Sequence, residues 1–343
     1  MLDALAERLT NAEIADRLCV SHRTVESHVS SLLRKFDVPN RRELANLARS
    51  RRRDSTRARR VPPAFDLAVE SGPLVGRRCE LDELRTLWRR ARGGRTIVAV
   101  VTGEAGIGKS RLVAQFATEV HREGGRVLLG SCFEDLQNPY QPFADAISAG
   151  FEGMSPDEVR RELAGDVRAL GRLVPIFLAE TGTIDVVDAA TERADVLAGI
   201  ARHLVRTAQT GNVLLVLEDL HWASATTRDA LRHLVRTSGG VPLLLLVTSR
   251  DTPPEATDDL NAVINELTRA PGAHHLRISG LDRHDVERLI ASIPNPAFLV
   301  DSHTIYEQTG GNPLLVREML AAGPGAPPSA APYTACSPFA HGA

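Results

Sequence analysis

Residues Gly103–Ser110 read Gly-Glu-Ala-Gly-Ile-Gly-Lys-Ser, and they follow the apolar stretch Thr96–Thr102, which reads Thr-Ile-Val-Ala-Val-Val-Thr. The β-branched residues favour a buried strand before the glycines, and apolar residues at helical spacing favour a helix from Arg111 onward. Glycines let backbone N–H groups curl around phosphate groups, and the N-terminus of a helix adds positive potential there. The spacing G-x-x-x-x-G-K-[S/T] in this setting predicts that the chain binds a nucleoside triphosphate.

Two side chains of this phosphate loop have the chemistry that a triphosphate requires. Lys109 is predicted to reach the β- and γ-phosphates, and Ser110 is predicted to hold Mg²⁺. The alternative is an ordinary glycine turn before a helix, which the combination of strand, loop, Lys-Ser pair and helix disfavours. The predicted nucleotide-binding residues of this stretch are Gly103, Glu104, Ala105, Gly106, Ile107, Gly108, Lys109, Ser110 and Arg111.

Further strand-like stretches alternate with helical patterns after the phosphate loop. This alternation predicts an α/β fold in which helices cover both faces of a parallel sheet. Ligands of such sheets lie beyond the carboxyl ends of the strands, so the phosphate loop, Glu218–Asp219 and Arg250 are expected to converge. The expected strands cover Arg126–Ser131, Val213–Leu217, Val241–Val247 and His275–Ile278.

Glu218 and Asp219 directly follow one of these apolar strands. One carboxylate is predicted to orient Mg²⁺, and its neighbour to position or deprotonate the attacking water; the residues leave open which does which. The alternative is an exposed strand end that caps the next helix. Arg250 is predicted to sense the γ-phosphate, with a surface turn residue as the alternative. His221 and Trp222 are interpreted as packing residues.

Composition describes a globular chain with an uneven distribution of charge. Hydrophobic residues make up 43% and charged residues 24% of the 343 positions, and this excludes a disordered or membrane-spanning class. Residues 1–60 carry a net charge of +6 and the remainder carries −8, although the whole chain has only −2. Such a division predicts a nucleic-acid-binding N-terminal segment. Four widely spaced cysteines indicate neither a zinc site nor a disulfide framework, so we expect a cytoplasmic protein.

The first fifty residues have the pattern of short helices joined by tight turns. Thr10–Glu13 and Asn40–Glu43 have the spacing of capping boxes, and Ser21 can cap a helix between them. Two short helices across a tight turn, the second polar on its outer face, predict a helix-turn-helix that enters the major groove of duplex DNA. A helical module that binds protein is the alternative. The apolar stripe of the second helix is Val25, Val29, Leu32, Leu33 and Phe36.

Leu9–Leu18 and Ser21–Val29, together with Leu33–Phe36, closely resemble the LuxR-type helix-turn-helix domain over about residues 2–49. The resemblance implies double-stranded promoter DNA as a partner, contact with the transcription machinery, and a homodimer or higher oligomer. Glu26 stands where many relatives have a basic residue, and a glutamate can accept a hydrogen bond from cytosine N4. The DNA-contacting residues that the resemblance implies are Arg23, Thr24, Glu26, Ser27, Ser30, Lys35 and Arg41.

A second resemblance covers about residues 73–320 and concerns the ATPase module of large ATP-binding LuxR-type regulators, which is of the STAND or AAA-like type. It implies that Val75, Gly76 and Arg77 line an adenine pocket, that Pro313 approaches the adenine, and that ATP or ADP binds with Mg²⁺. In those regulators the helix-turn-helix usually lies at the far C-terminus, so a truncated or rearranged member is expected. The matching segments are Val75–Arg77, Gly103–Ser110, Cys132–Leu136, Pro139–Phe143, Glu218–Trp222 and Gly310–Pro313.

These patterns predict five segments. They are a helix-turn-helix domain (1–49), a basic linker (50–72), a P-loop ATPase domain (73–280), a small helical lid (281–320) and a disordered tail (321–343). The predicted function is that of an ATP-binding transcriptional regulator, in which slow hydrolysis resets a nucleotide switch. Two alternatives remain open: an ATPase that acts on DNA as an initiator or remodeller, and an inert remnant that binds nucleotide without signalling.

Overall fold

The computed structural model describes residues 72–135, 138–151, 156–163, 165–171, 173, 189–293 and 301–322, with single positions from residue 10 to residue 65. The chain divides into two compact units, Met1–Arg60 and Val61–Ala343, and each is described by itself. Among the described residues, no helix combines the length and the apolar character that a membrane span requires.

In the first unit, side chains cap two helical segments. The backbone N–H of Thr10 donates to Glu13 Oε2 over 2.6 Å, and the Glu13 N–H donates back to Thr10 Oγ1 over 3.3 Å. The Glu43 N–H donates to Asn40 Oδ1 over 2.9 Å. Both predicted caps are therefore confirmed, since each side-chain oxygen accepts a backbone N–H that has no partner in the first helical turn.

The same unit has an aliphatic core at its described positions. Val25 and Val29 are helical and buried, as the predicted apolar stripe requires. Ile14 and Leu44 are also buried, each next to one of the two caps. The predicted DNA contacts lie outside the described residues, and they are Arg23, Thr24, Glu26, Ser27, Ser30, Lys35 and Arg41.

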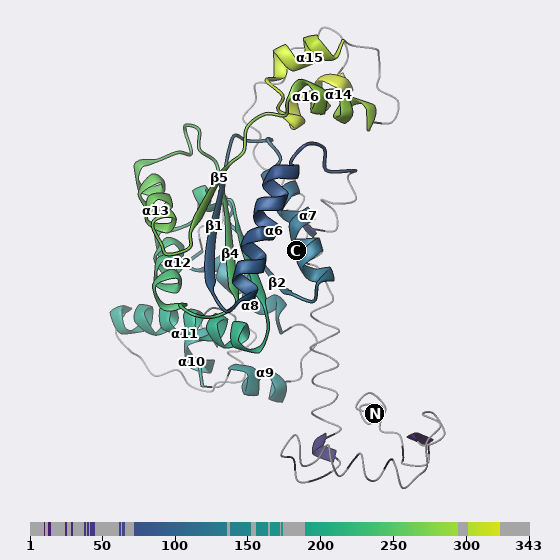
Figure 1. Ribbon diagram of the computed structural model, residues 1–343. Helices are drawn as coiled ribbons and strands as arrows, with labels where there is room; N and C mark the ends of the chain where they lie inside the picture. The colour runs from purple at the N-terminus through teal and green to yellow at the C-terminus, as the bar shows by residue number, and fades with distance from the viewer. Residues whose placement is uncertain are drawn as a thin grey trace. The chain divides into compact units, whose positions relative to one another are not determined.

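The second unit is built on a five-stranded sheet with the order β2-β3-β4-β1-β5, in which each neighbouring pair is parallel (Figure 1). The predicted parallel sheet is thus confirmed. Strand β4 begins and ends two residues later than predicted, because Pro242 has no N–H to donate to the ladder, whereas Thr248 and Ser249 pair with β1. The strands are β1 (Thr96–Thr102), β2 (Arg126–Ser131), β3 (Val213–Glu218), β4 (Leu243–Ser249) and β5 (His274–Arg277).

Helices cover both faces of this sheet because every central strand is apolar on both sides. Leu214 and Val216 face α6 and α7, while Leu215 and Leu217 face the layer formed by α8 and α10–α13. The helices of the layers are α6 (Arg78–Arg92), α7 (Lys109–Arg122), α8 (Gln141–Ala149), α9 (Pro156–Leu163), α10 (Val167–Gly171), α11 (Ala189–Thr210), α12 (Ala225–Thr237) and α13 (Asp258–Thr268).

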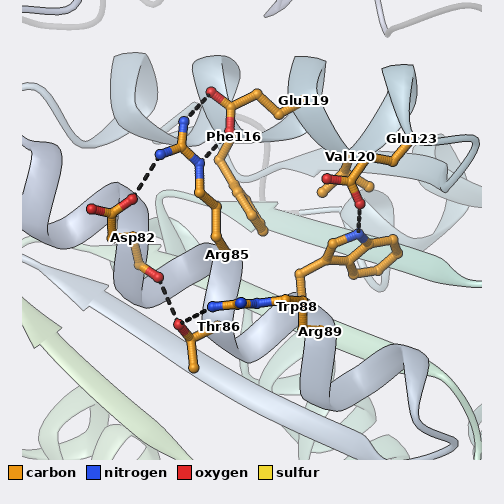
Figure 2. A pocket seen from close by; sticks show the side chains of 9 residues that line it. All are labelled: Asp82, Arg85, Thr86, Trp88, Arg89, Phe116, Glu119, Val120 and Glu123. Atoms are coloured by element: carbon orange, nitrogen blue, oxygen red, sulfur yellow. Dashed lines mark hydrogen bonds and ion pairs between the residues drawn. The ribbon is translucent and has the colours of Figure 1, made fainter.

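Polar contacts join α6 to α7, the helix that begins at the phosphate loop. Arg85 makes two hydrogen bonds of 2.8 Å to the Glu119 carboxylate, and Trp88 Nε1 donates to Glu123 Oε2 over 3.1 Å (Figure 2). These side chains line a hollow of about 380 Å³ between the two helices. A bidentate arginine–carboxylate pair fixes orientation as well as distance, so α7 is held in register with α6.

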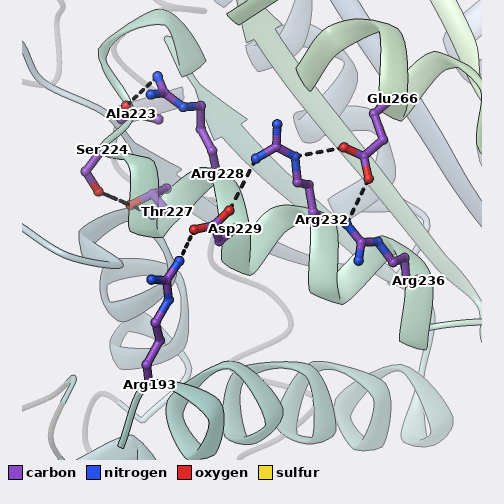
Figure 3. Close-up of polar contacts among 9 residues, drawn as sticks. All are labelled: Arg193, Ala223, Ser224, Thr227, Arg228, Asp229, Arg232, Arg236 and Glu266. Carbon is purple, nitrogen blue, oxygen red and sulfur yellow. Dashed lines mark hydrogen bonds and ion pairs between the residues drawn. The ribbon is translucent and has the colours of Figure 1, made fainter. Parts of the chain in front are cut away.

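On the opposite face, alternating charges connect α11, α12 and α13 (Figure 3). Asp229 pairs with Arg193 of α11, and Arg232 bridges Asp229 and Glu266 over 3.2 and 2.8 Å. Arg236 adds a second contact to Glu266 over 2.9 Å. Exposed pairs stabilise a fold little, but a connected set restricts how its helices slide against one another. The set connects α12 to α11 on one side and to α13 on the other.

After β5, helices α14 (Arg283–Ala291), α15 (Ser302–Thr309) and α16 (Pro313–Ala322) share an apolar core of their own, and we call them the lid. Helix α16 ends two residues beyond the predicted end of the lid at residue 320. The Leu281 N–H donates to the Gly311 carbonyl over 2.8 Å. A Cβ on Gly311 would lie 2.0 Å from the Leu281 carbonyl oxygen, and one on Gly280 would lie 2.0 Å from the Gly310 oxygen. We call Gly280 and Gly311 the glycine seam, since only glycine lets these two backbones approach the neighbouring carbonyl oxygens so closely.

Candidate functional site

The phosphate loop joins β1 to α7 at the carboxyl edge of the sheet. Gly108, with φ of 103° and ψ of 20°, precedes the first turn of α7, and a side chain would be strained in that left-handed conformation. No side chain caps the N-terminus of α7. Its first N–H groups therefore face the loop, which is the arrangement that binds anions at a helix N-terminus.

Lys109 lies inside the curve of this loop, and only 7% of its surface is exposed. Its Nζ donates to the carbonyl oxygens of Gly103 and Glu104 over 3.0 and 2.9 Å. Burial lowers the pKa of Lys109, and the charge of Asp219 opposes that change. An ammonium group has three protons, so these bonds leave a third donor for a phosphate oxygen.

Glu218 ends β3 and is 1% exposed. Its two carboxyl oxygens are buried, and neither has a hydrogen-bond partner of normal geometry among the described residues. Burial and then the charge of Asp219 raise the pKa of Glu218 to about 8. The nearby Ser110 hydroxyl and the positive charge of Lys109 both lower the pKa of Glu218, but burial outweighs them.

A divalent cation fits these residues. A buried carboxyl without a partner is unfavourable, and a cation beside it removes that penalty. The Glu218 carboxylate and the Ser110 hydroxyl are oxygen donors, which are the ligands that Mg²⁺ prefers. No group of three or more His, Cys, Asp or Glu side chains that could hold a metal occurs in the described ranges. Mg²⁺ at this place would therefore rely on phosphate and water oxygens for its other ligands.

Asp219 follows Glu218 in a left-handed conformation, with φ of 55° and ψ of 49°. Aspartate tolerates this region better than most residues, and the Asp219 N–H donates to Thr248 Oγ1 over 3.0 Å. Burial raises the pKa of the Asp219 carboxyl, while Lys109 and Arg250 lower it. With 30% of its side chain exposed, Asp219 faces water, whereas Glu218 does not.

Arg250 follows β4, which lies between β3 and β1 in the sheet. Its guanidinium pairs with Glu255 and lies 5.8 Å from the centre of the Trp222 ring. Burial lowers the pKa of His221 to about 3, so its ring is neutral, and Nδ1 accepts the Arg250 N–H over 3.4 Å. The two residues interpreted as packing residues, His221 and Trp222, thus pack against Arg250.

Arg77 connects the loop to the chain after β5. Its Nη2 donates to the carbonyl oxygens of Ile107 and Ser279 over 3.0 and 2.6 Å, and its Nη1 pairs with Glu80. Its guanidinium therefore braces protein carbonyls, and a contact of Arg77 with adenine remains a prediction. The Arg111 side chain similarly donates to the Pro73 carbonyl over 3.1 Å and to that of Gly72.

The lid touches the tip of the phosphate loop. Asn312 Nδ2 donates to the Ala105 carbonyl oxygen over 2.9 Å, and a Cβ on Gly106 would lie 2.6 Å from Leu314 Cβ. Pro313 begins α16 between these two contacts, while Val75 packs against the apolar core of the lid. The loop, the V-G-R segment and the G-G-N-P turn therefore meet. Neither Asn312 nor Glu255 stood out as a site residue in the sequence.

The family follows from the sequence matches to known domains. Residues 73–247 match the AAA ATPase domain. The chain belongs to the AAA ATPase domain family. Residues 1–48 match the LuxR family of bacterial regulatory proteins, which confirms the LuxR-type helix-turn-helix. The protein therefore combines a DNA-binding regulatory domain with an ATPase module.

Several of the similar proteins extend well beyond the part that matches this chain. An uncharacterized protein of Rhizobium meliloti (strain 1021) is 28% identical over 265 residues, which are 72% of this chain and 25% of that protein. The chain thus spans a quarter of that relative. A STAND protein with a tetratricopeptide repeat sensor from Pyrococcus horikoshii shares 17% identity, covers 74% of this chain and 31% of its own, and has a TM-score of 0.39. The Orc1 protein of Aeropyrum pernix, solved with DNA, has 14% identity, shares of 73% and 61%, and a TM-score of 0.42.

Proposed function

We propose that this protein is a transcriptional regulator whose ATPase module is an ATP/ADP switch. The observation that carries the proposal is the contact of the lid with the phosphate loop, where Asn312 binds the Ala105 carbonyl. A nucleotide that reorganises the loop would change this contact, so the lid can respond to occupancy. A ligand shifts an equilibrium between two conformations only if it binds them with unequal affinity. Because the lid contacts the loop that would hold the phosphates, the nucleotide can bind the states with and without this contact unequally.

The proposed roles follow from where the side chains lie. The third N–H of the Lys109 ammonium group would donate a hydrogen bond to the triphosphate. Ser110 and Glu218 would hold Mg²⁺, which would neutralise phosphate charge. Because Glu218 is buried next to Ser110 and Asp219 is open to water, we assign the metal to Glu218 and the attacking water to Asp219. Arg250 is the proposed contact to the γ-phosphate.

The proposed hydrolysis is slow and resets the switch. Asp219→Asn should reduce the rate of phosphate release more than it weakens ATP binding, since the carboxylate acts mainly in the transition state. Phosphate release and calorimetric ATP affinity, measured on the same preparations, check this. An equal loss in both would move the role of Asp219 from the water to binding.

The regulator is proposed to act in the cytoplasm on promoter DNA, as a homodimer or higher oligomer that contacts the transcription machinery. Its match to the LuxR family supports the DNA-binding part. The proposed segments are a helix-turn-helix (1–49), a linker (50–72), the ATPase domain (73–280), the lid (281–320) and a tail (321–343).

Selection of bound duplex fragments by the purified full chain tests the switch. The selection is run with ATP, with ADP and without nucleotide, for the wild type and for Lys109→Ala, which removes the cation inside the loop. We expect the affinity for the selected DNA to differ between ATP and ADP in the wild type alone. If ATP binds the wild type but DNA affinity is the same in all three conditions, the ATPase module does not control DNA binding.

A further inference from the structure

The position of Arg250 in the sheet places it between the two halves of the nucleotide site. Ser249, the last residue of β4, pairs with Thr102, the last residue of β1, so Arg250 follows β4 at the level where Gly103 follows β1 and the phosphate loop begins. On the other side of β4, strand β3 ends at Glu218. Neighbouring strands lie only about 5 Å apart, so a long arginine side chain reaches either neighbour.

In this structure the Arg250 guanidinium has one acidic and one aromatic partner. It pairs with Glu255, and the two side chains are only 19% and 12% exposed. The ring of Trp222 lies 5.8 Å from the guanidinium carbon, which is within the range of a cation–π contact. Of these two partners only Glu255 carries a negative charge, so the ion pair with Glu255 is the main electrostatic attraction on the guanidinium.

Glu255 is itself fixed by the short connection between β4 and α13. Two residues later, Thr257 caps α13 by accepting the Leu260 N–H at Oγ1 over 3.3 Å. Asp251, the other acidic residue of this connection, is paired over 2.8 Å with Arg277 of β5. The two acidic side chains of this connection thus have different cationic partners, and Asp251 provides a matched control for Glu255.

We propose that Glu255 competes with the γ-phosphate of ATP for the Arg250 guanidinium. This inference rests on the proposed nucleotide function. ATP binding exchanges one anionic partner of Arg250 for another and leaves Glu255 buried without its cation, which weakens ATP binding. ADP has no γ-phosphate and leaves the Arg250–Glu255 pair in place. Glu255 therefore sets the preference of the site between ATP and ADP.

Calorimetric titration of the full chain with Mg-ATP and with Mg-ADP tests the competition. Glu255→Gln keeps the shape of the side chain and removes its charge, so the Kd for ATP should fall about tenfold while the Kd for ADP changes less than about twofold. Asp251→Asn should leave the ratio of the two Kd values unchanged. In an Arg250→Gln background, the additional Glu255→Gln change should no longer alter that ratio.

Trp222 provides a second readout that does not depend on the Glu255 variant. The chain has two tryptophans, so Trp88→Phe leaves Trp222 as the only indole. Departure of the guanidinium from this ring should change its fluorescence on addition of Mg-ATP but not of Mg-ADP. Equal changes with both nucleotides, or equal shifts of both Kd values in Glu255→Gln, would overturn the competition. A wild type that binds neither nucleotide would instead overturn the proposed function, and the competition with it.

Discussion

Glu218→Gln should stabilise the nucleotide-free protein, and the gain should grow as the pH rises from about 5 to 8. Burial raises the pKa of this carboxyl from its ordinary value of 4.5 to about 8. Between these pH values the folded wild type keeps a proton that the unfolded chain has released. The contribution of Glu218 to the free energy of unfolding of the wild type is therefore fully present below pH 4.5 and is lost as the pH rises through 8. Each unit of separation corresponds to about 1.4 kcal/mol, which gives an upper limit of about 5 kcal/mol over the whole interval and about 3 kcal/mol at pH 7.

Urea unfolding at several pH values between 5 and 8 measures this effect. Both tryptophans, Trp88 and Trp222, lie in the second unit, so their fluorescence reports the unfolding of the ATPase module. Other titrating groups are common to both proteins and cancel in the difference between wild type and Glu218→Gln. Glu104→Gln, which removes the charge of an exposed carboxylate of the phosphate loop, is the control.

Parallel curves for wild type and Glu218→Gln would refute the reasoning, because they would show that the Glu218 proton has the same affinity in both states. A second observation should agree with the first. Since Mg²⁺ needs an ionised carboxylate, the affinity of the wild type for Mg-ATP should rise with pH up to about 8. Glu218→Gln should lose that pH dependence together with most of the dependence on metal.

Two further changes test the lid and the DNA-binding unit. Asn312→Ala removes the hydrogen bond to Ala105, which contributes about 1 kcal/mol, so hydrogen exchange in residues 301–322 should accelerate about fivefold while α6 is unaffected. Unchanged exchange would show that this bond does not hold the lid. Glu26→Ala should relax the preference at one base pair in a binding selection at fixed salt, whereas Lys35→Ala should weaken all sequences alike and reduce the salt dependence. Identical base preferences in wild type and Glu26→Ala would exclude base readout by Glu26.

The parts of the fold that were predictable from sequence depend on neighbours in the chain. The strand before the phosphate loop, the glycines and the helix predicted from Arg111 follow from short-range patterns. The structure confirms these elements, and the helix begins two residues earlier than predicted, at Lys109. The contact between Asn312 and Ala105 joins residues 207 positions apart, and no periodicity marks it. The Arg250–Glu255 pair spans only five residues, yet it depends on the path of an irregular connection.

The two carboxylates after β3 show the same limit within two adjacent residues. Sequence placed both Glu218 and Asp219 at the end of a strand but did not separate their environments. The left-handed conformation of Asp219 turns the chain there, and one carboxyl becomes buried while the other keeps 30% exposure. Which of the two is desolvated depends on that single turn of the backbone, and a turn of this kind leaves no compositional mark.

At the glycine seam, direct contacts between backbones fix the position of the lid. A Cβ added to Gly311 or Gly280 would lie 2.0 Å from a neighbouring carbonyl oxygen. One added carbon would therefore push the two backbones apart and displace the start of α16. The two seam positions are therefore a diagnostic for other chains of this architecture: glycine at both permits a lid in this position, and a larger residue at Gly280 or Gly311 forbids it.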